Sequence, residues 1–218
     1  MSREKIRPRP NYDKIASCYD LLLLGSGGYL KKSQLKLLTY VPDVDKALLV
    51  GEGTGNFLKQ LKKQKDISTI VYIDSSLQMC RIARKKNRIR KNRQKNYFIC
   101  GDLDSIQNRV DFSLVTTHYF LDQFEETSLQ TTMKKIAQKI HPGGYWLFTD
   151  FMPPETLFQK AVIYFLYLFF RKFSNIEAKR IPDYHKFFVM NGFVPIKEKK
   201  MKFGIQTTLY QKEKRTTL

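Results

Sequence analysis

The sequence is short of cysteine and lacks the features of an exported chain. Its three cysteines, Cys18, Cys80 and Cys100, are odd in number, lie far apart and show no paired spacing. This usage argues against a disulfide framework and against a metal site of the zinc type, and it predicts a reducing compartment, by default the cytoplasm. The first ten residues are charged and contain no apolar stretch, so we expect no secretory signal.

A long hydrophobic run is also missing. The most apolar segment, residues 161–170, has ten residues, whereas about 20 are needed to span a bilayer. Lys160 precedes this segment, and Arg171 and Lys172 follow it. The segment is therefore expected to be a core helix or a helix at an interface, and the latter would place the protein at the inner face of the membrane.

Acidic residues are scarce relative to basic ones, so this is a basic protein. The 218 residues include 39 lysines and arginines but only 20 aspartates and glutamates, and the net charge is +19. The densest basic run covers residues 85–95. Such a charge fits three roles: solubility, attraction to an anionic membrane surface, and binding of nucleic acid. The charge alone does not choose among them.

From about residue 45 onward, short apolar runs alternate with amphipathic ones. This pattern is typical of βαβ units and a parallel sheet. The predicted strands are residues 46–50, 69–74, 97–100, 111–116 and 145–150, followed by a hairpin formed by residues 193–202 and 205–212. A purely parallel nucleotide-binding sheet does not need that closing antiparallel hairpin.

One predicted helix carries signals at both ends. Thr127 and Gln130 have the spacing of a capping box, and Leu129, Met133, Ile136 and Ile140 fall on one face at helical spacing. The segment His141-Pro-Gly-Gly is expected to terminate this helix, because proline lacks the amide hydrogen and glycine tolerates the left-handed conformation.

Candidate ligand-binding residues follow three successive strands. Gly51-Glu-Gly-Thr-Gly55 joins the first strand to a helix, where glycine lets the backbone pass close to a ligand. Asp74 ends the second strand and is placed to accept hydrogen bonds from ribose hydroxyls, and Asp102 follows the third, suitably for an adenine amino group. Ligands of open α/β sheets bind at these carboxyl ends, so we expect a nucleoside cofactor here.

The sequence resembles the motif series of class I S-adenosylmethionine-dependent methyltransferases. The segments that carry the resemblance occur in the same order, and they are the glycine segment, Asp74, Gly101-Asp102, the Asp111 strand and His141-Pro-Gly-Gly. The resemblance covers about residues 45–150 and the terminal hairpin. It implies a Rossmann-like doubly wound α/β sheet of seven strands, mostly parallel, with an antiparallel strand from the C-terminal hairpin. It also implies S-adenosylmethionine as the cofactor, bound by residues at the strand ends: Gly51, Glu52, Gly53, Gly55, Asp74, Ser75, Gly101, Asp102, Leu103 and Thr117.

The N-terminal segment Tyr12-Asp-Lys-Ile-Ala-Ser-Cys-Tyr-Asp20 is similar to the arm of methyltransferases that act on small or lipid-like molecules, including the ubiquinone/menaquinone C-methyltransferase group. The resemblance implies that this arm folds over the cofactor, with Tyr19 lining it. As an alternative, Tyr19 is an aromatic anchor for the arm. The family usually has an acid two residues before the first glycine; here Leu49 stands there, and Glu52 is the candidate to order the methionine end of the cofactor.

A single domain over residues 1–218 is expected, with an N-terminal helical arm (1–40), a cofactor-binding core (45–150), a helical substrate cover (151–190) and the hairpin (193–213). His118 follows the fourth strand, where the family places acceptor-facing groups, and it is a candidate for proton transfer or for packing. The predicted function is methyl transfer to a small, lipophilic acceptor. An RNA-directed methyltransferase or an RNA-binding protein is the alternative, and a catalytically silent binding protein is a third possibility.

Overall fold

The computed structural model describes residues 12–13, 16, 28–88, 94–106, 111–174, 176 and 178–214. Within these ranges the chain forms one seven-stranded sheet with the order β3-β2-β1-β4-β5-β7-β6. The sheet is parallel from β3 to β5, whereas β7 runs antiparallel to both β5 and β6. The strands are β1 (Lys46–Val50), β2 (Thr69–Asp74), β3 (Lys95–Cys100), β4 (Phe112–His118), β5 (Ile140–Phe151), β6 (Phe193–Met201) and β7 (Ile205–Lys212).

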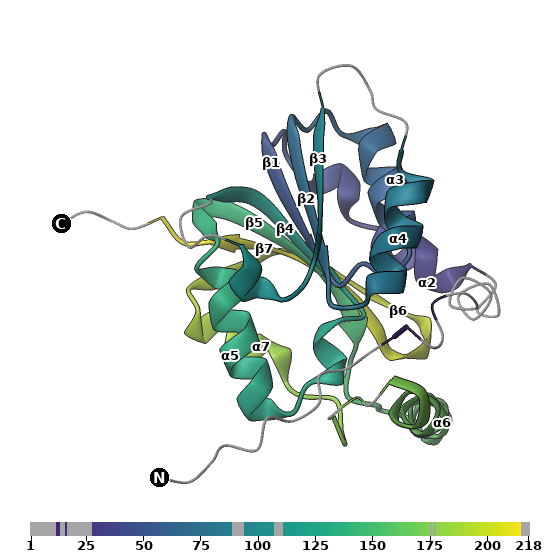
Figure 1. The fold of residues 1–218 in the computed structure, drawn as a ribbon. Helices are drawn as coiled ribbons and strands as arrows, with labels where there is room; N and C mark the ends of the chain where they lie inside the picture. Colours follow the sequence, from purple (N-terminus) through teal and green to yellow (C-terminus); the bar gives the residue numbers. More distant parts are fainter. Residues whose placement is uncertain are drawn as a thin grey trace, which may run out of the picture.

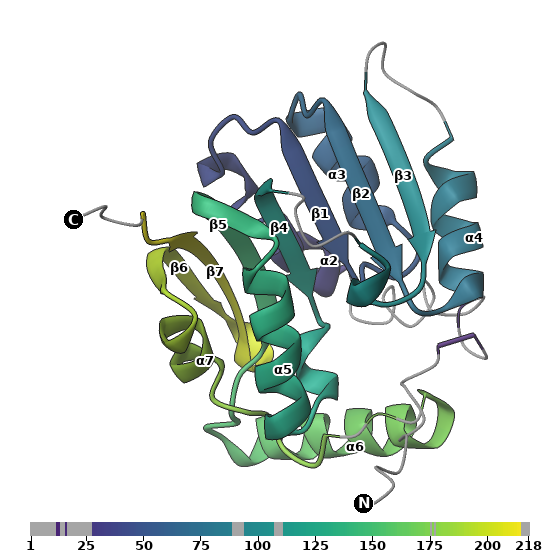
Figure 2. The ribbon, with the colours of Figure 1, turned by 60° about the vertical axis from the view of Figure 1, so that its left-hand side comes forward.

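Helices cover both faces of this sheet, and one lies across its carboxyl edge (Figures 1 and 2). The first face carries α2 (Tyr29–Gln34), α3 (Asn56–Gln64) and α4 (Leu77–Lys86), and the second carries α5 (Glu126–Ala137) and α7 (Tyr184–Met190). The long helix α6 (Leu157–Ser174) lies beyond the carboxyl ends of the parallel strands. Short 3-10 turns occupy Leu38–Tyr40 (η1), Leu103–Ser105 (η2), Leu121–Gln123 (η3) and Lys202–Gly204 (η4).

The central strand β1 explains why the sheet has two hydrophobic cores. Side chains alternate between the faces of a strand, so Ala47 and Leu49 pack under α3 and α4, while Leu48 and Val50 pack under α5 and α7. All four are buried. A strand buried on both faces reads as an unbroken apolar run, which is how this strand could be predicted. The predicted Rossmann-like mixed sheet with its C-terminal hairpin is thereby confirmed.

Two details of the predicted helix before the fifth strand are wrong. The helix α5 begins at Glu126, its N-terminal cap is Glu125, and no side chain caps it, so Thr127 and Gln130 do not form a capping box there. The helix ends at Ala137, and Ile140 already belongs to β5. The Pro-Gly-Gly segment therefore lies inside a strand, next to an irregularity in the β4–β5 pairing, rather than ending the helix.

The apolar segment 161–170 lies within α6 and is only half covered. Ile163 and Tyr167 are buried, whereas Tyr164 and Phe165 are 63% and 68% exposed. The expectation of a core helix is therefore wrong for one face of α6, and a helix at an interface stays a prediction. No helix in the described ranges combines the length and the apolarity that crossing a bilayer requires.

Candidate active site

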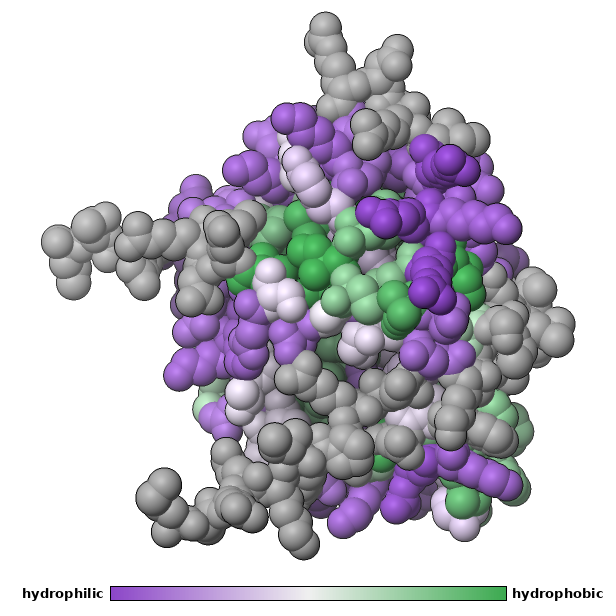
Figure 3. Space-filling view, viewed as in Figure 1, coloured by the Kyte–Doolittle hydropathy of each residue, from purple (hydrophilic) through white to green (hydrophobic). Residues whose placement is uncertain are grey.

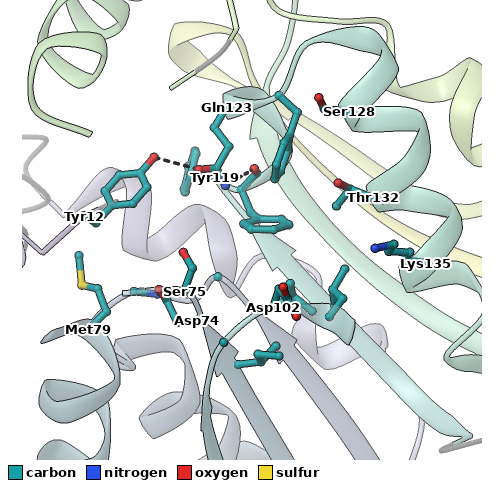
Figure 4. A pocket seen from close by; sticks show the side chains of 18 of the residues that line it. Tyr12, Asp74, Ser75, Met79, Asp102, Tyr119, Gln123, Ser128, Thr132 and Lys135 are labelled. Atoms are coloured by element: carbon teal, nitrogen blue, oxygen red, sulfur yellow. Dashed lines mark hydrogen bonds between the residues drawn. The ribbon is translucent and has the colours of Figure 1, made fainter. Parts of the chain in front are cut away.

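A pocket of about 240 Å³ opens at the carboxyl edge of the parallel strands (Figure 4). Its walls come from the ends of β1, β2, β3 and β4, from the N-terminal part of α4 and from one side of α5. Its lining includes Tyr12, Gly51, Gly53, Asp74, Ser75, Met79, Gly101, Asp102, Leu103, Tyr119, Phe120, Gln123, Phe124, Ser128, Thr132 and Lys135.

Asp74, at the end of β2, is a buried acid of the pocket that three hydrogen bonds hold in place. One carboxylate oxygen accepts hydrogen bonds from the amide of Gly53 and the hydroxyl of Tyr72, both at 3.3 Å, and the other accepts from the amide of Ser76 at 2.9 Å. Burial raises the pKa of Asp74 to about 6, although these three hydrogen bonds oppose the rise. The side chain is thus fixed in place at the pocket wall, where it is a suitable acceptor for hydroxyl groups.

Gly51 has to be glycine for two reasons. Its φ of +65° lies in the left-handed region, which side chains disfavour. A Cβ on this residue would also lie 2.2 Å from the ring of Phe120, which packs directly over it. The first glycine of the β1–α3 segment therefore lets the end of β4 pack closely against the end of β1.

The side of the pocket near β3 is polar. Asp102 caps η2, because one of its carboxylate oxygens accepts from the amides of Asp104 and Ser105 at 3.1 and 3.2 Å. Across from it, α5 contributes Thr132 and Lys135, and the Lys135 ammonium pairs with the Asp104 carboxylate at 2.6 Å. These groups surround the place that the sequence assigns to an adenine ring.

The N-terminal segment contributes to the opposite side of the pocket. The hydroxyl of Tyr12 donates to the side-chain oxygen of Gln123 at 3.3 Å, as Figure 4 shows, and its ring lies 6.1 Å from that of Phe170 in α6. Next to it, the Asp13 carboxylate accepts from the hydroxyl of Ser76 and from the amide of Gln78 at the start of α4. This part of the predicted arm therefore lies over the pocket. Tyr19 lies outside the described residues.

Most of the predicted cofactor-binding residues line this pocket, and four predicted site residues do not. Those that line it are Gly51, Gly53, Asp74, Ser75, Gly101, Asp102 and Leu103. Gly55 caps α3 in the left-handed conformation and packs against Ala83 and Asn87. Thr117 is buried and accepts a hydrogen bond from the indole of Trp146 at 2.8 Å. The other two, Glu52 and His118, contact each other.

Glu52 and His118 form a buried pair behind the pocket wall. Nδ1 of His118 lies 2.8 and 3.0 Å from the two carboxylate oxygens of Glu52, which also accepts a hydrogen bond from the hydroxyl of Thr116. The His118 ring packs edge-on against Phe57, with 4.2 Å between ring centroids. Neither side chain of the pair is exposed. The pair joins the β1–α3 segment to the end of β4, a geometry that favours the packing role of His118.

Sequence reasoning missed several lining residues, of which Tyr119 is the most unusual. Its φ of +54° is rare for a bulky residue, and strained backbone of this kind gathers at functional sites. Its hydroxyl shares a hydrogen bond of 2.5 Å with the hydroxyl of Ser33 in α2. No sequence signal announces a tyrosine in this conformation. Met79, Phe120 and Gln123 likewise reach the pocket only through the packing of α4 and η3.

The lining fits a nucleoside cofactor. Three strand ends bring together a close-packed glycine, the ordered carboxylate of Asp74 and the polar group around Asp102, which is the set that a methionine chain, a ribose and an adenine require. Among the described residues, no cluster of three or more histidine, cysteine, aspartate or glutamate side chains could hold a metal ion.

Comparison with known proteins agrees with this geometry. Residues 47–144 match the family described as "Methyltransferase domain". The chain is 31% identical over 104 residues to malonyl-[acyl-carrier protein] O-methyltransferase of Priestia megaterium, a match that covers 48% of this chain and 36% of that protein. It is 26% identical over 164 residues to carboxy-S-adenosyl-L-methionine synthase of Nautilia profundicola, over 73% of this chain and 69% of that protein.

The fold has close structural counterparts. A methyltransferase in complex with the Haloferax volcanii activator Trm112 superposes with a TM-score of 0.73 at 16% identity, over 94% of this chain and 99% of that one. The match to malonyl-[acyl-carrier protein] O-methyltransferase covers only about a third of that protein. The resemblance to the quinone C-methyltransferase group stays a prediction. Over residues 47–144, less than half of its length, the chain is thus similar to a methyltransferase domain, and S-adenosylmethionine is the cofactor that this similarity implies.

Proposed function

We propose that this chain transfers a methyl group from S-adenosylmethionine to a small, lipophilic acceptor. The observation that carries the proposal is the convergence of Gly51, Asp74 and Asp102 on one pocket whose lining also includes four aromatic side chains, Tyr12, Tyr119, Phe120 and Phe124. Bound S-adenosylmethionine supplies an already activated methyl group, so the chain needs mainly to position an acceptor in line with it and to exclude water. Tyr12, Tyr119 and Phe120 are placed to do both.

The lipophilic character of the acceptor is inferred from the aromatic part of the pocket lining. There Tyr12, Phe120 and Phe124 line the wall, and Phe170 of α6 packs against Tyr12. Aromatic walls favour apolar or flat acceptors, because burial of their faces is worth about 25 cal/mol per Å². The names of the two relatives give an acyl substrate for one and a cofactor-derived product for the other, and neither names a lipophilic acceptor. A direct assay of the acceptor is therefore part of the test.

An RNA acceptor is the competing function, favoured by the basic cluster Arg81, Arg84, Lys85 and Arg88. This cluster runs from the middle of α4 to Arg88, just beyond the C-cap Asn87, and it reaches toward the amino edge of the sheet. The pocket lies at the carboxyl edge. A polyanion bound to the basic cluster would therefore not present a base to the pocket, which weighs against RNA as the acceptor.

Calorimetry with S-adenosylhomocysteine tests the cofactor, and methyl incorporation from labelled S-adenosylmethionine tests the acceptor. We expect S-adenosylhomocysteine to bind and NAD not to bind. We expect Asp74→Asn to weaken binding by roughly 1.5–3 kcal/mol, the range for hydrogen bonds to a charged group. Label should enter a lipid extract and not RNA. Preference for NAD would refute the cofactor, and label in RNA alone would refute the acceptor.

A further inference from the structure

Five lysines surround a groove of about 470 Å³. Two come from α2 and the residues just after it, two from the end of β6 and one from η4, and they are Lys32, Lys36, Lys199, Lys200 and Lys202. In the part of the chain that the structure describes, no carboxylate forms an ion pair with any of them. Cations gathered in this way repel each other and attract an anion, so the groove is suited to phosphate groups.

An aromatic contact joins this lysine groove to α6. Phe203, at the tip of the β6–β7 hairpin, is 44% exposed and has a φ of +62°. Its ring lies 5.5 Å from that of Tyr29, which lines the groove, and 6.3 Å from that of Phe158 in the first turn of α6. The groove and the helix therefore form one continuous surface.

The outward face of α6 is apolar. Its exposed side chains recur at helical spacing and are Leu157, Phe158, Ala161, Tyr164, Phe165 and Leu168. Lys160 and Arg171 are exposed near the two ends of this row. In Figure 3, apolar and hydrophilic side chains lie together at the lower right, where α6 lies in Figure 1. An apolar helix face with basic residues beside it is the composition of a helix that lies in a membrane interface.

The sheet topology places the lysine groove and α6 at the same edge. Because β7 is antiparallel to both β5 and β6, β6 runs in the direction of the parallel strands and ends at the carboxyl edge, where α6 lies. Lys85 and Arg88 lie at the opposite edge, since α4 leads back to the start of β3. The described part of the basic run 85–95 therefore cannot reach a flat surface that contacts the exposed face of α6.

We propose that the lysine groove and the exposed face of α6 together dock this protein on an anionic phospholipid membrane. Lipid phosphates would occupy the groove, while Tyr164, Phe165 and Leu168 enter the boundary between headgroups and acyl chains. Nucleic acid is a poorer partner, because it has no use for an exposed apolar helix face. This docking does not depend on the proposed methyl transfer.

Docking would also place the pocket close to the lipid. The buried face of α6 contacts the residues around the pocket: the hydroxyl of Tyr167 donates to the carbonyl oxygen of Asp122 at 3.1 Å, and Phe170 packs against Tyr12. A helix that rests on the membrane with one face and on the pocket wall with the other gives a lipophilic molecule a short path between the two.

Sedimentation with phosphatidylcholine vesicles, with and without phosphatidylglycerol, tests the docking. We expect the protein to sediment only with the anionic vesicles and to be released at high salt. The triple variant Lys199→Gln, Lys200→Gln, Lys202→Gln should bind about 100-fold more weakly, at roughly fivefold for each lysine near the surface. The triple variant Tyr164→Ser, Phe165→Ser, Leu168→Ser should lose at least about tenfold.

The matched control removes the same charge from the opposite edge of the molecule through Arg84→Gln, Lys85→Gln and Arg88→Gln. This control should bind vesicles like the unaltered chain. Circular dichroism shows whether each variant is folded, and none of the altered residues lines the pocket. Equal losses in the control and in the lysine variant, unchanged binding by the α6 variant, or binding of an RNA oligonucleotide in place of vesicles would each overturn the proposal.

Discussion

At the scale of single residues, the carboxyl of Asp74 makes the pocket sensitive to pH. Burial raises its pKa to about 6, so a substantial fraction of the free protein carries a proton on Asp74 at mildly acidic pH. The ionised form is the better acceptor for two hydroxyl groups, and a bound ligand that needs this form must displace the proton. Ligand affinity is therefore expected to depend on pH in the range just below 6.

We predict that the affinity for S-adenosylhomocysteine is constant above pH 7 and falls as the pH drops through 6. The fall approaches about tenfold per pH unit once Asp74 is mostly protonated in the free protein. Calorimetry between pH 5 and 8, a window set by the pKa of about 6, checks this. Asp74→Asn should bind more weakly but with little slope. An equal slope in that variant would assign the proton to another group.

The pair of Glu52 and His118 gives a second prediction at this scale. Because the pair is buried and does not line the pocket, His118→Ala should lower the free energy of unfolding by about 3 kcal/mol, as for removal of one partner of a buried pair. Turnover per folded molecule should change little. Denaturant unfolding and a methyl-transfer assay measure the two effects, and His185→Ala, an exposed histidine in α7, is the control.

A loss of about 100-fold in turnover by folded His118→Ala would contradict this expectation and would restore the proton-transfer role that the position of His118 after the fourth strand predicts. The sequence placed His118 at the correct strand end. It gave no sign of the partner, because Glu52 is 66 residues away in the chain and the contact exists only once β1 and β4 pair.

At the scale of elements, the turn η3 is held to the end of β5 by one buried carboxylate. Asp150 accepts from the amides of Leu121 and Asp122 at 3.0 and 3.3 Å, and from that of Phe151 at 2.9 Å. Burial raises the pKa of Asp150, and it also raises the pKa of its neighbour Asp122 to about 7. The two carboxyls repel each other when both are ionised, which adds to the rise in the pKa of Asp150.

This pair predicts that the fold loses stability toward alkaline pH. A carboxyl whose pKa is higher in the folded than in the unfolded chain contributes stability that is fully present below about pH 4 and is lost as the pH rises through about 7. The melting temperature should therefore fall between pH 6 and 8 for this chain and much less for Asp122→Asn. Thermal unfolding followed by circular dichroism measures this, and parallel declines in both proteins would rule out the pair as the cause.

The elements also show what sequence patterns can predict. The strands β1 and β2 have the predicted bounds, because each is an apolar run between polar residues, and the sheet buries both of their faces. The end of α5 could not be predicted from Pro-Gly-Gly. The amide of Phe112 bonds to the carbonyl of Lys139, so pairing with β4 extends β5 back past the proline. A contact across the sheet overrides the local signal.

At the scale of the whole molecule, the charge of +19 is divided between separate surfaces. The lysine groove faces the carboxyl edge of the sheet, and the cluster around Arg84 and Lys85 faces the amino edge. The sequence showed the amount of charge and its densest run. It could not show the groove, because Lys32 and Lys199 are far apart in the chain and meet only through the contact of α2 with the β6–β7 hairpin.

The pocket links distant parts of the molecule, so its ligand should stabilise the fold as a whole. Its lining comes from the ends of four strands, from α4 and α5, and from Tyr12 in the N-terminal segment. A ligand at about 100 times its dissociation constant adds roughly 2.7 kcal/mol to the free energy of unfolding. For a domain of this size, that corresponds to a rise of roughly 5–10 °C in melting temperature. We predict this rise with S-adenosylhomocysteine.

The same measurement separates binding at the strand ends from binding elsewhere. At one fixed ligand concentration, Asp74→Asn should show a much smaller rise, because the stabilisation by a ligand depends on its affinity. The triple variant Lys199→Gln, Lys200→Gln, Lys202→Gln should show the full rise in melting temperature, since the groove and the pocket share no lining residue. If the rise disappeared with the lysine substitutions and survived Asp74→Asn, S-adenosylhomocysteine would be binding in the groove through its carboxylate, and the assignment of the pocket to the cofactor would be wrong.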